Sequence, residues 1–239
     1  MPAFDRVLII ETAGRVGQLA LAADDVVVAD AHLGEARKRA SDLALVVDRL
    51  LKEQGWAPRE LTAVVVGLGP GSYTGLRVGL ASAKALAYAT RCAFFGVETF
   101  AAIAERLPPE VEAVSVIADA LQGKLFRRDY RRNASREWEP ASRLEIVAAS
   151  DWLASLRPGL WVSGPAAGML ADQFAADVRV VSADEREPRA VDLLNVAKKH
   201  PWAVTTDVWT AEPLYLRGSS AEEKRALSEP GSDRVAADR

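Results

Sequence analysis

The sequence has one cysteine and two histidines among its 239 residues, which limits the kinds of site it can build. A single cysteine, Cys92, excludes a disulfide within the chain. The histidines, His32 and His200, are not at metal-ligand spacing, so we expect no metal site. A serine nucleophile would need one of them as its base, and the sequence around Ser72 is not the G-x-S-x-G elbow of hydrolases. A hydrolase is therefore disfavoured.

Long apolar runs and a large excess of one charge are also absent. No run approaches membrane-spanning length, and the first residues lack the basic start and apolar stretch of a signal peptide. A net charge of −3 argues against a strong nucleic-acid binder, which usually carries a basic stripe. The composition, 49% hydrophobic and 26% charged, is that of an ordinary globular protein. We expect a cytoplasmic protein without membrane association.

One order of predicted elements, three strands followed by helix, strand, helix, strand and helix, occurs twice along the chain. The first half has strands 7–10, 16–22, 26–31, 63–67 and 93–97 and helices 41–54, 75–90 and 99–106. The second has strands 114–118, 124–130, 143–147, 160–162 and 178–181 and helices 150–156, 166–175 and 189–199. This order predicts an α/β fold of two ribonuclease-H-like domains facing each other across a cleft. The expected domains are residues 1–107 and 108–217, followed by a mobile tail at 218–239.

Residues 64–89 combine a glycine loop with a helix of small residues. The loop, which contains Gly69 and Gly71, places backbone N–H groups at a helix N-terminus, where anions bind; a simple tight turn is the alternative. Neither a Walker loop nor a dinucleotide fingerprint fits it. The helix residues Gly75, Gly79, Ala83 and Ala87 recur every four positions and form a ridge on one face. Such a ridge suits close docking of another helix, or equally packing inside its own domain.

Two acidic residues end corresponding strands of the two halves. Glu11 ends the first strand, and Asp119 ends the first strand after the Pro108–Pro109 pair. Matched acids across a cleft are where a two-domain ATP-binding fold holds Mg²⁺ and phosphates, whereas the alternative is that each carboxylate caps a turn. The candidate nucleotide- or anion-binding residues are Glu11, Thr12, Gly69, Gly71, Ser72 and Asp119.

Four segments resemble the TsaB family, also called YeaZ. They are GLGPGSYTGLRVGLASAKALA (67–87), LIIETAGRVGQLALA (8–22), ADALQGKLFRRDY (118–130) and PLYLR (213–217). The first is similar to the family's glycine signature, G-P-G-S-[FY]-T-G-[LV]-R with a Gly/Ala-rich helix. Two features depart from the family pattern: Glu11 stands where Asp is usual, and the hairpin differs at Leu121, Gln122, Lys124 and Phe126.

The resemblance implies a non-catalytic member of the sugar kinase/actin/Hsp70 superfamily. Its partner would be TsaD, the enzyme that transfers a threonylcarbamoyl group to a tRNA adenosine, and the ATPase TsaE would join the complex. Contact with tRNA would be indirect. No cofactor is expected on the chain alone, whereas ATP or ADP and Mg²⁺ would be bound in the complex. Pairing would use helices 41–54 and 75–90. The interface candidates are Leu43, Val47, Leu50, Gly75, Gly79, Ala83 and Ala87.

Two further functions stay open at this point. The chain would be an ATP-dependent phosphotransferase or ATPase of the same superfamily if Glu11 and Asp119 held Mg²⁺. Separately, an exposed small-residue ridge would pair with itself, so a homodimer is expected when TsaD is absent.

Overall fold

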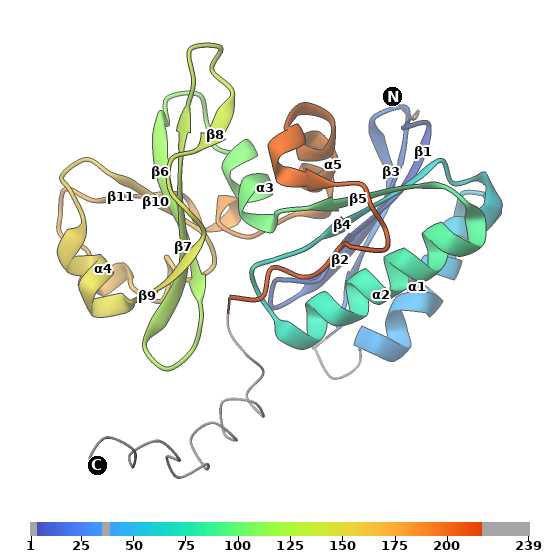
Figure 1. Ribbon diagram of the computed structural model, residues 1–239, viewed down its shortest axis with the longest axis horizontal. Coiled ribbons are helices and arrows are strands. Elements are labelled where there is room, and N and C mark those ends of the chain that lie inside the picture. The colour runs from blue at the N-terminus through green and yellow to red at the C-terminus, as the bar shows by residue number, and fades with distance from the viewer. Residues whose placement is uncertain (1–3, 35–38, 217–239) are drawn as a thin grey trace, which may run out of the picture.

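Two mixed sheets, one in each half of the molecule, organise the computed structural model, which describes residues 4–34 and 39–216 (Figure 1). The first half contains β1 (Arg6–Glu11), β2 (Gly17–Ala23), β3 (Val26–Leu33), α1 (Arg39–Glu53), β4 (Ala63–Gly67), α2 (Tyr73–Thr90), β5 (Ala93–Val97) and α3 (Thr99–Glu105). The second contains β6 (Ala113–Asp119), β7 (Lys124–Arg132), β8 (Trp138–Pro140), β9 (Glu145–Ala148), α4 (Ala149–Ser155), β10 (Trp161–Ser163) and β11 (Arg179–Val180). The chain then forms α5 (Ala190–Lys199) and β12 (Val204–Thr205).

Both sheets share one strand order. In the first sheet β1 pairs antiparallel with β2 and parallel with β4, which gives the order β12-β5-β4-β1-β2-β3. In the second, β6 likewise pairs antiparallel with β7 and parallel with β10, which gives β11-β10-β6-β7-β8, with β9 also beside β7. Three antiparallel strands followed by two parallel ones on the far side of the first strand form the ribonuclease-H-like arrangement. The predicted fold class is therefore confirmed.

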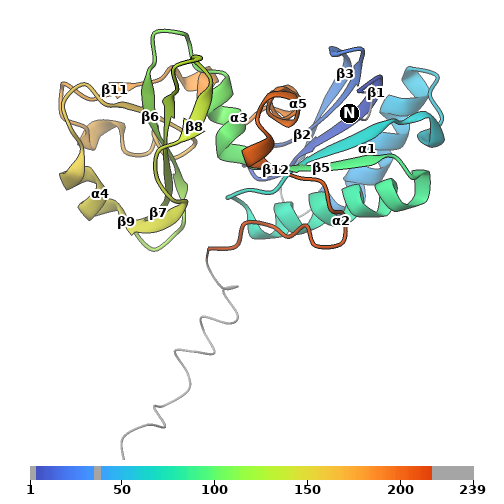
Figure 2. The same ribbon diagram turned by 45° about the horizontal axis from the view of Figure 1, so that its top comes forward.

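The first sheet is covered by helices on both faces. Because side chains alternate along a strand, Leu8 and Ile10 of β1 pack in the cluster that contains the α1 and α2 side chains. Val7 and Ile9 pack in the other cluster, with residues of α3 and α5. Figure 2 shows α3 and α5 between the two sheets, with α1 and α2 on the opposite face of the first sheet. Burial on both faces explains why β4 is a continuous apolar run.

The predicted second domain, 108–217, includes the last helix and strand. The structure places both of them with the first domain instead. The helix α5 packs on β1, β4 and β5 of the first sheet, and β12 pairs antiparallel with β5, Val204 opposite Val97. The chain therefore leaves the first domain after α3 and returns to it at α5. The segment after β12 runs beside α2, where the N–H of Leu214 donates to the carbonyl of Leu68 at 2.8 Å. The expected tail, 218–239, lies outside the described residues.

In the second half one predicted helix is absent, and the strand β8 was missed. The helix expected at 166–175 is a series of turns with a short 3-10 helix at Ala171–Gln173. Gly164 has φ +98°, and the N–H of Ala167 donates to the carbonyl of Gly164 at 3.0 Å. This bond spans three residues, as in a turn, rather than the four of an α-helix. The strand β8, which lies between β7 and β9, was not predicted; it is anchored by Trp138, which is 2% exposed. Among the described residues, no helix is both long and apolar enough to cross a membrane.

Candidate functional site

A cleft of about 600 Å³ separates the two domains. Its first-domain wall includes Gly71 and Ser72 of the glycine loop together with Thr99, and Asp119 lies in its second-domain wall. The remaining lining is largely apolar: Leu76, Phe100, Ile103, Ala118, Phe126, Pro165, Leu214 and Leu216. The fold thus brings the glycine loop and Asp119 to one cavity, with the last described residues at its edge.

The glycine loop is held by hydrogen bonds within the chain. The N–H of Gly69, a residue with φ +95°, donates to Thr99 Oγ1 at 3.2 Å. The N–H of Ser72 donates to the carbonyl of Ala13 at 2.8 Å, and a Cβ on Gly71 would lie only 2.7 Å from that of Ala13. Ser72 Oγ accepts from the N–H of Gly75 at 3.2 Å and so caps α2. Several N–H groups of the predicted anion site are therefore occupied by the chain itself.

The two acidic residues occupy different environments. Glu11 is fully buried behind the cleft wall; its carboxylate accepts from the N–H of Ala13 at 2.5 Å and from Thr99 Oγ1 at 3.1 Å. Asp119 is exposed at the cleft, and its Oδ1 accepts from the N–H of Leu121 at 2.7 Å. Each carboxylate thus caps the turn that follows its strand, as the alternative interpretation supposed. Thr12, next to Glu11, is also fully buried, against α2.

All seven predicted interface residues lie in the core of the first domain. Leu43, Val47 and Leu50 of α1 are at most 9% exposed. Gly75, Gly79, Ala83 and Ala87 form the buried face of α2. A Cβ on Gly79 would overlap Thr12 Oγ1 and lie 3.4 Å from Ile10 Cγ2, so the ridge exists to bring α2 close to β1. The expectation that this ridge is exposed for docking is wrong.

The outer faces of α1 and α2 carry a different set of side chains. The exposed residues of α2 are Thr74, Arg77, Ala81, Ala85, Tyr88 and Ala89, and those of α1 include Ala44, Leu45, Asp48, Arg49 and Lys52. Ala81, Ala85 and Ala89 form a second four-residue series, which was visible in the sequence but was not singled out. Leu45 is 69% exposed and adds apolar area to the outer face of α1.

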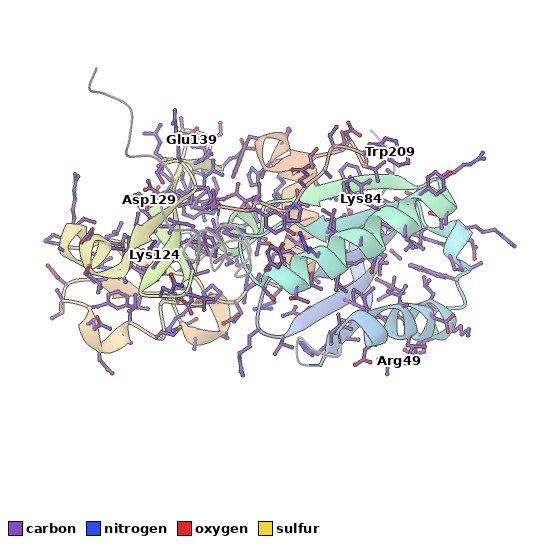
Figure 3. All side chains as sticks on the ribbon, turned by 60° about the horizontal axis from the view of Figure 1, so that its bottom comes forward. Arg49, Lys84, Lys124, Asp129, Glu139 and Trp209 are labelled. Carbon is purple, nitrogen blue, oxygen red and sulfur yellow. The ribbon has the colours of Figure 1, made fainter. Side chains whose placement is uncertain are left out.

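Two aromatic pairs, Tyr73 with Tyr215 and Tyr88 with Trp209, lie at opposite ends of α2, and sequence reasoning missed them. Tyr88 and Trp209 are 71% and 74% exposed and meet edge to face, with ring centroids 5.8 Å apart. Arg77 lies 4.3 Å from the Tyr73 ring, and its Nε donates to the Tyr215 hydroxyl at 2.9 Å. Figure 3 shows Lys84 and Trp209 together along this helix, where Lys84 Nζ donates to the Trp209 carbonyl at 3.4 Å. These contacts attach the C-terminal segment to α2.

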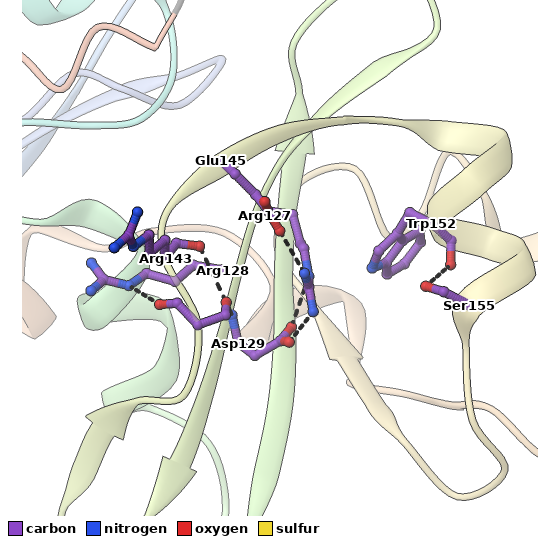
Figure 4. Close-up of polar contacts among 8 residues, drawn as sticks. Arg127, Arg128, Asp129, Arg143, Glu145, Trp152 and Ser155 are labelled. Atoms are coloured by element: carbon purple, nitrogen blue, oxygen red, sulfur yellow. Dashed lines mark hydrogen bonds and ion pairs between the residues drawn. The ribbon is translucent and has the colours of Figure 1, made fainter.

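The arginines of β7 are compensated within the protein. Arg127 pairs with Asp129 and with Glu145, the latter at 2.6 Å, and Arg128 Nε donates to the carbonyl of Ser142 at 3.2 Å (Figure 4). Of the hairpin positions that depart from the family pattern, Phe126 and the exposed Leu121 line the cleft, and Gln122 and Lys124 are exposed. This hairpin therefore presents an apolar side chain to the cavity rather than a basic stripe.

These features define a two-domain ribonuclease-H-like protein whose interdomain cleft has a largely apolar lining. A family model described as "TsaD: tRNA N6-adenosine threonylcarbamoyltransferase" matches residues 35–153. The "tRNA threonylcarbamoyladenosine biosynthesis protein TsaB" of Bacillus subtilis (strain 168) is 30% identical over 227 residues, covering 91% of this chain and 96% of that protein. The chain therefore belongs to the TsaB family.

A second relative has the same name, and a solved structure has the same fold. The protein of the same name from Escherichia coli (strain K12) is 29% identical over 233 residues, covering 92% of this chain and 97% of that one. The solved structure of YeaZ from Pseudomonas aeruginosa has the same fold, with a TM-score of 0.72 at 23% identity, and covers 89% of this chain and 100% of that one.

Proposed function

We propose that the chain acts in threonylcarbamoyladenosine biosynthesis on tRNA as a non-catalytic partner of TsaD. The similarity to two proteins named for this pathway over nearly their whole length supports the pathway. The observation that carries the non-catalytic role is the hydrogen bonding of Glu11, whose fully buried carboxylate accepts from the Ala13 N–H and the Thr99 hydroxyl. A carboxylate held in this way caps a turn and is not placed to bind Mg²⁺ in the cavity.

The proposed docking surface is the outer face of the α1–α2 pair. Small side chains at Ala81, Ala85 and Ala89 let a partner helix approach α2 closely, and exposed Leu45 offers apolar area on α1. This surface keeps the two helices expected from the family resemblance but replaces the buried residues by exposed ones. In this proposal TsaE joins through the complex, tRNA contact is indirect, and two copies pair through the same face when TsaD is absent.

The test is co-purification with TsaD of the same organism, using Ala85→Arg. An arginine at this exposed position leaves the fold intact but prevents close helix approach, so we expect binding roughly ten- to hundred-fold weaker, equivalent to about 1–3 kcal/mol. Ala154→Arg, on the exposed face of α4, is the matched control and should bind normally.

A tRNA-modification assay with and without the chain tests the pathway. Modification that depends on the chain supports the proposal. Normal TsaD binding by Ala85→Arg would exclude this docking face. ATP turnover by the chain alone that Glu11→Ala abolishes would instead indicate the phosphotransferase.

A further inference from the structure

A buried polar cluster joins the two domains at their interface. Glu98, which immediately precedes α3, is 6% exposed. Its carboxylate forms an ion pair with Arg128 and accepts a hydrogen bond from the Tyr130 hydroxyl, and both partners lie on β7 of the second domain. Trp202, in the returning C-terminal segment, adds its ring 6.1 Å from that of Tyr130 and 5.9 Å from the Arg128 guanidinium. Three separate segments of the chain thus meet in one cluster around Glu98.

Because the cluster is buried, its stability depends on the distance and orientation between its charged groups. Two charges taken out of water are compensated only when they face each other closely and their remaining hydrogen-bonding groups are satisfied. Here the Arg128 Nε donates to the Ser142 carbonyl at 3.2 Å, and the side chains of Glu98 and Arg128 are 7% and 19% exposed. Burial and the Glu98 charge together raise the pKa of Tyr130, so its phenol stays protonated and donates. A small rotation of one domain against the other would separate these partners.

The same segment reaches the cleft through the next residue. The N–H of Thr99 donates to the carbonyl of Gly69 at 2.9 Å, and Thr99 Oγ1 donates to Glu11 at 3.1 Å. On the other side, the N–H of Glu98 donates to the carbonyl of Ala203 at 3.0 Å. Residues 98 and 99 therefore connect β7, the returning chain, the glycine loop and Glu11.

We propose that Glu98 is an interdomain latch that fixes the opening of the cleft. Through Arg128 and Tyr130, Glu98 sets the angle between the second domain and the first. Through the adjacent Thr99, it fixes the position of the glycine loop relative to the second domain. The shared apolar cluster keeps the domains attached, and the latch selects one orientation among those that the apolar contact permits. The cleft is then a preformed cavity rather than one that opens and closes.

The experiment measures the distance between the domains in the isolated full-length chain. Spin labels are placed at Asp5→Cys, directly before β1, and at Ser150→Cys on α4, both exposed and away from the α1–α2 face, in a Cys92→Ala background. The labelled chain is diluted into an excess of unlabelled chain, so that only distances within one copy are measured. Pulsed EPR should give one narrow distance distribution for the otherwise unchanged chain. Glu98→Gln and Arg128→Gln should each broaden this distribution and shift it to longer distances. Arg131→Gln is the control, because Arg131 lies on the same strand but pairs with Glu139 inside the second domain, at 2.8 Å.

Distributions of Glu98→Gln and Arg128→Gln that superimpose on that of the unchanged chain would overturn the latch. If these two variants do not fold, Tyr130→Phe decides, since it keeps the ring and removes one hydrogen bond: a broader distribution supports the latch and an unchanged one refutes it. Faster amide exchange at Thr99 in Glu98→Gln than in Arg131→Gln would support the coupling to the glycine loop. The measurement needs no partner, so its outcome is independent of TsaD binding.

Discussion

Replacement of Gly79 by alanine tests the close approach of α2 to the first sheet. In an exposed helix this change would stabilise the protein by about 1 kcal/mol, because alanine is the better helix former. Here the new Cβ would overlap Thr12 Oγ1 and touch Ile10 Cγ2 at 3.4 Å. Overpacking of this kind costs about 1–3 kcal/mol, and the buried, short Thr12 side chain has little room to move, which favours the upper part of that range. We expect a net loss of about 1–2 kcal/mol in the free energy of unfolding.

Urea unfolding followed by circular dichroism measures this change as a lower midpoint with an unchanged slope. The Thr12→Ala/Gly79→Ala double variant removes the overlapping oxygen. Its loss should therefore be smaller than the sum of the two single losses, by about 1–2 kcal/mol. Ala85→Gly on the outer face of α2 gives the propensity effect alone, a loss of about 1 kcal/mol. A Gly79→Ala variant as stable as the unchanged chain, together with additive double-variant energies, would refute the reasoning.

Three other predictions concern two buried carboxyl groups and one hydrogen bond at the surface. Glu11→Ala should lower the free energy of unfolding by about 2–4 kcal/mol, because it leaves the Ala13 N–H and the Thr99 hydroxyl unpaired, and Glu11→Gln should recover part of this loss in urea unfolding. Burial raises the pKa of Asp192 from 3.8 to about 7, although Arg106 Nε lies 3.4 Å from its Oδ2; the folded state therefore holds this proton more tightly than the unfolded chain. Stability should fall as the pH rises between these two values, and Asp192→Asn should remove that fall in thermal melts across the range. Arg77→Ala should speed proteolysis of the segment after β12, because it removes the hydrogen bond to the Tyr215 hydroxyl; unchanged cleavage would show that this hydrogen bond does not hold the segment.

Local periodicity was enough to find most elements of the first domain. The stripe of Leu43, Val47 and Leu50 predicts a helix at 41–54, which agrees within two residues with α1, because these side chains face one sheet. The helix at 166–175 was predicted because Ala166, Ala167 and Leu170 have helical spacing. The prediction was wrong because a turn begins at Gly164 and its hydrogen bonds reach back only three residues.

The sequence does not show whether the small-residue ridge contacts a strand of its own domain or a partner helix. Small residues at Gly75, Gly79 and Ala83 suit contact with a strand as well as with a partner helix. Only the position of Thr12 against α2, which depends on long-range folding, decides between them. The placement of α5 failed for a similar reason: its apolar stripe shows that it packs on something, without showing on which sheet.

The return of α5 and β12 to the first sheet makes that domain discontinuous along the chain. During synthesis the second domain, from β6 to β11, leaves the ribosome before the helix that packs with Val7 and Ile9. Until α5 arrives, one face of the first sheet lacks part of its cover, so the nascent chain carries exposed apolar surface of the kind that chaperones bind. Cutting the chain after 107 would leave that face open permanently. The two domains have separate sheets, but the first cannot be completed without synthesis of the second.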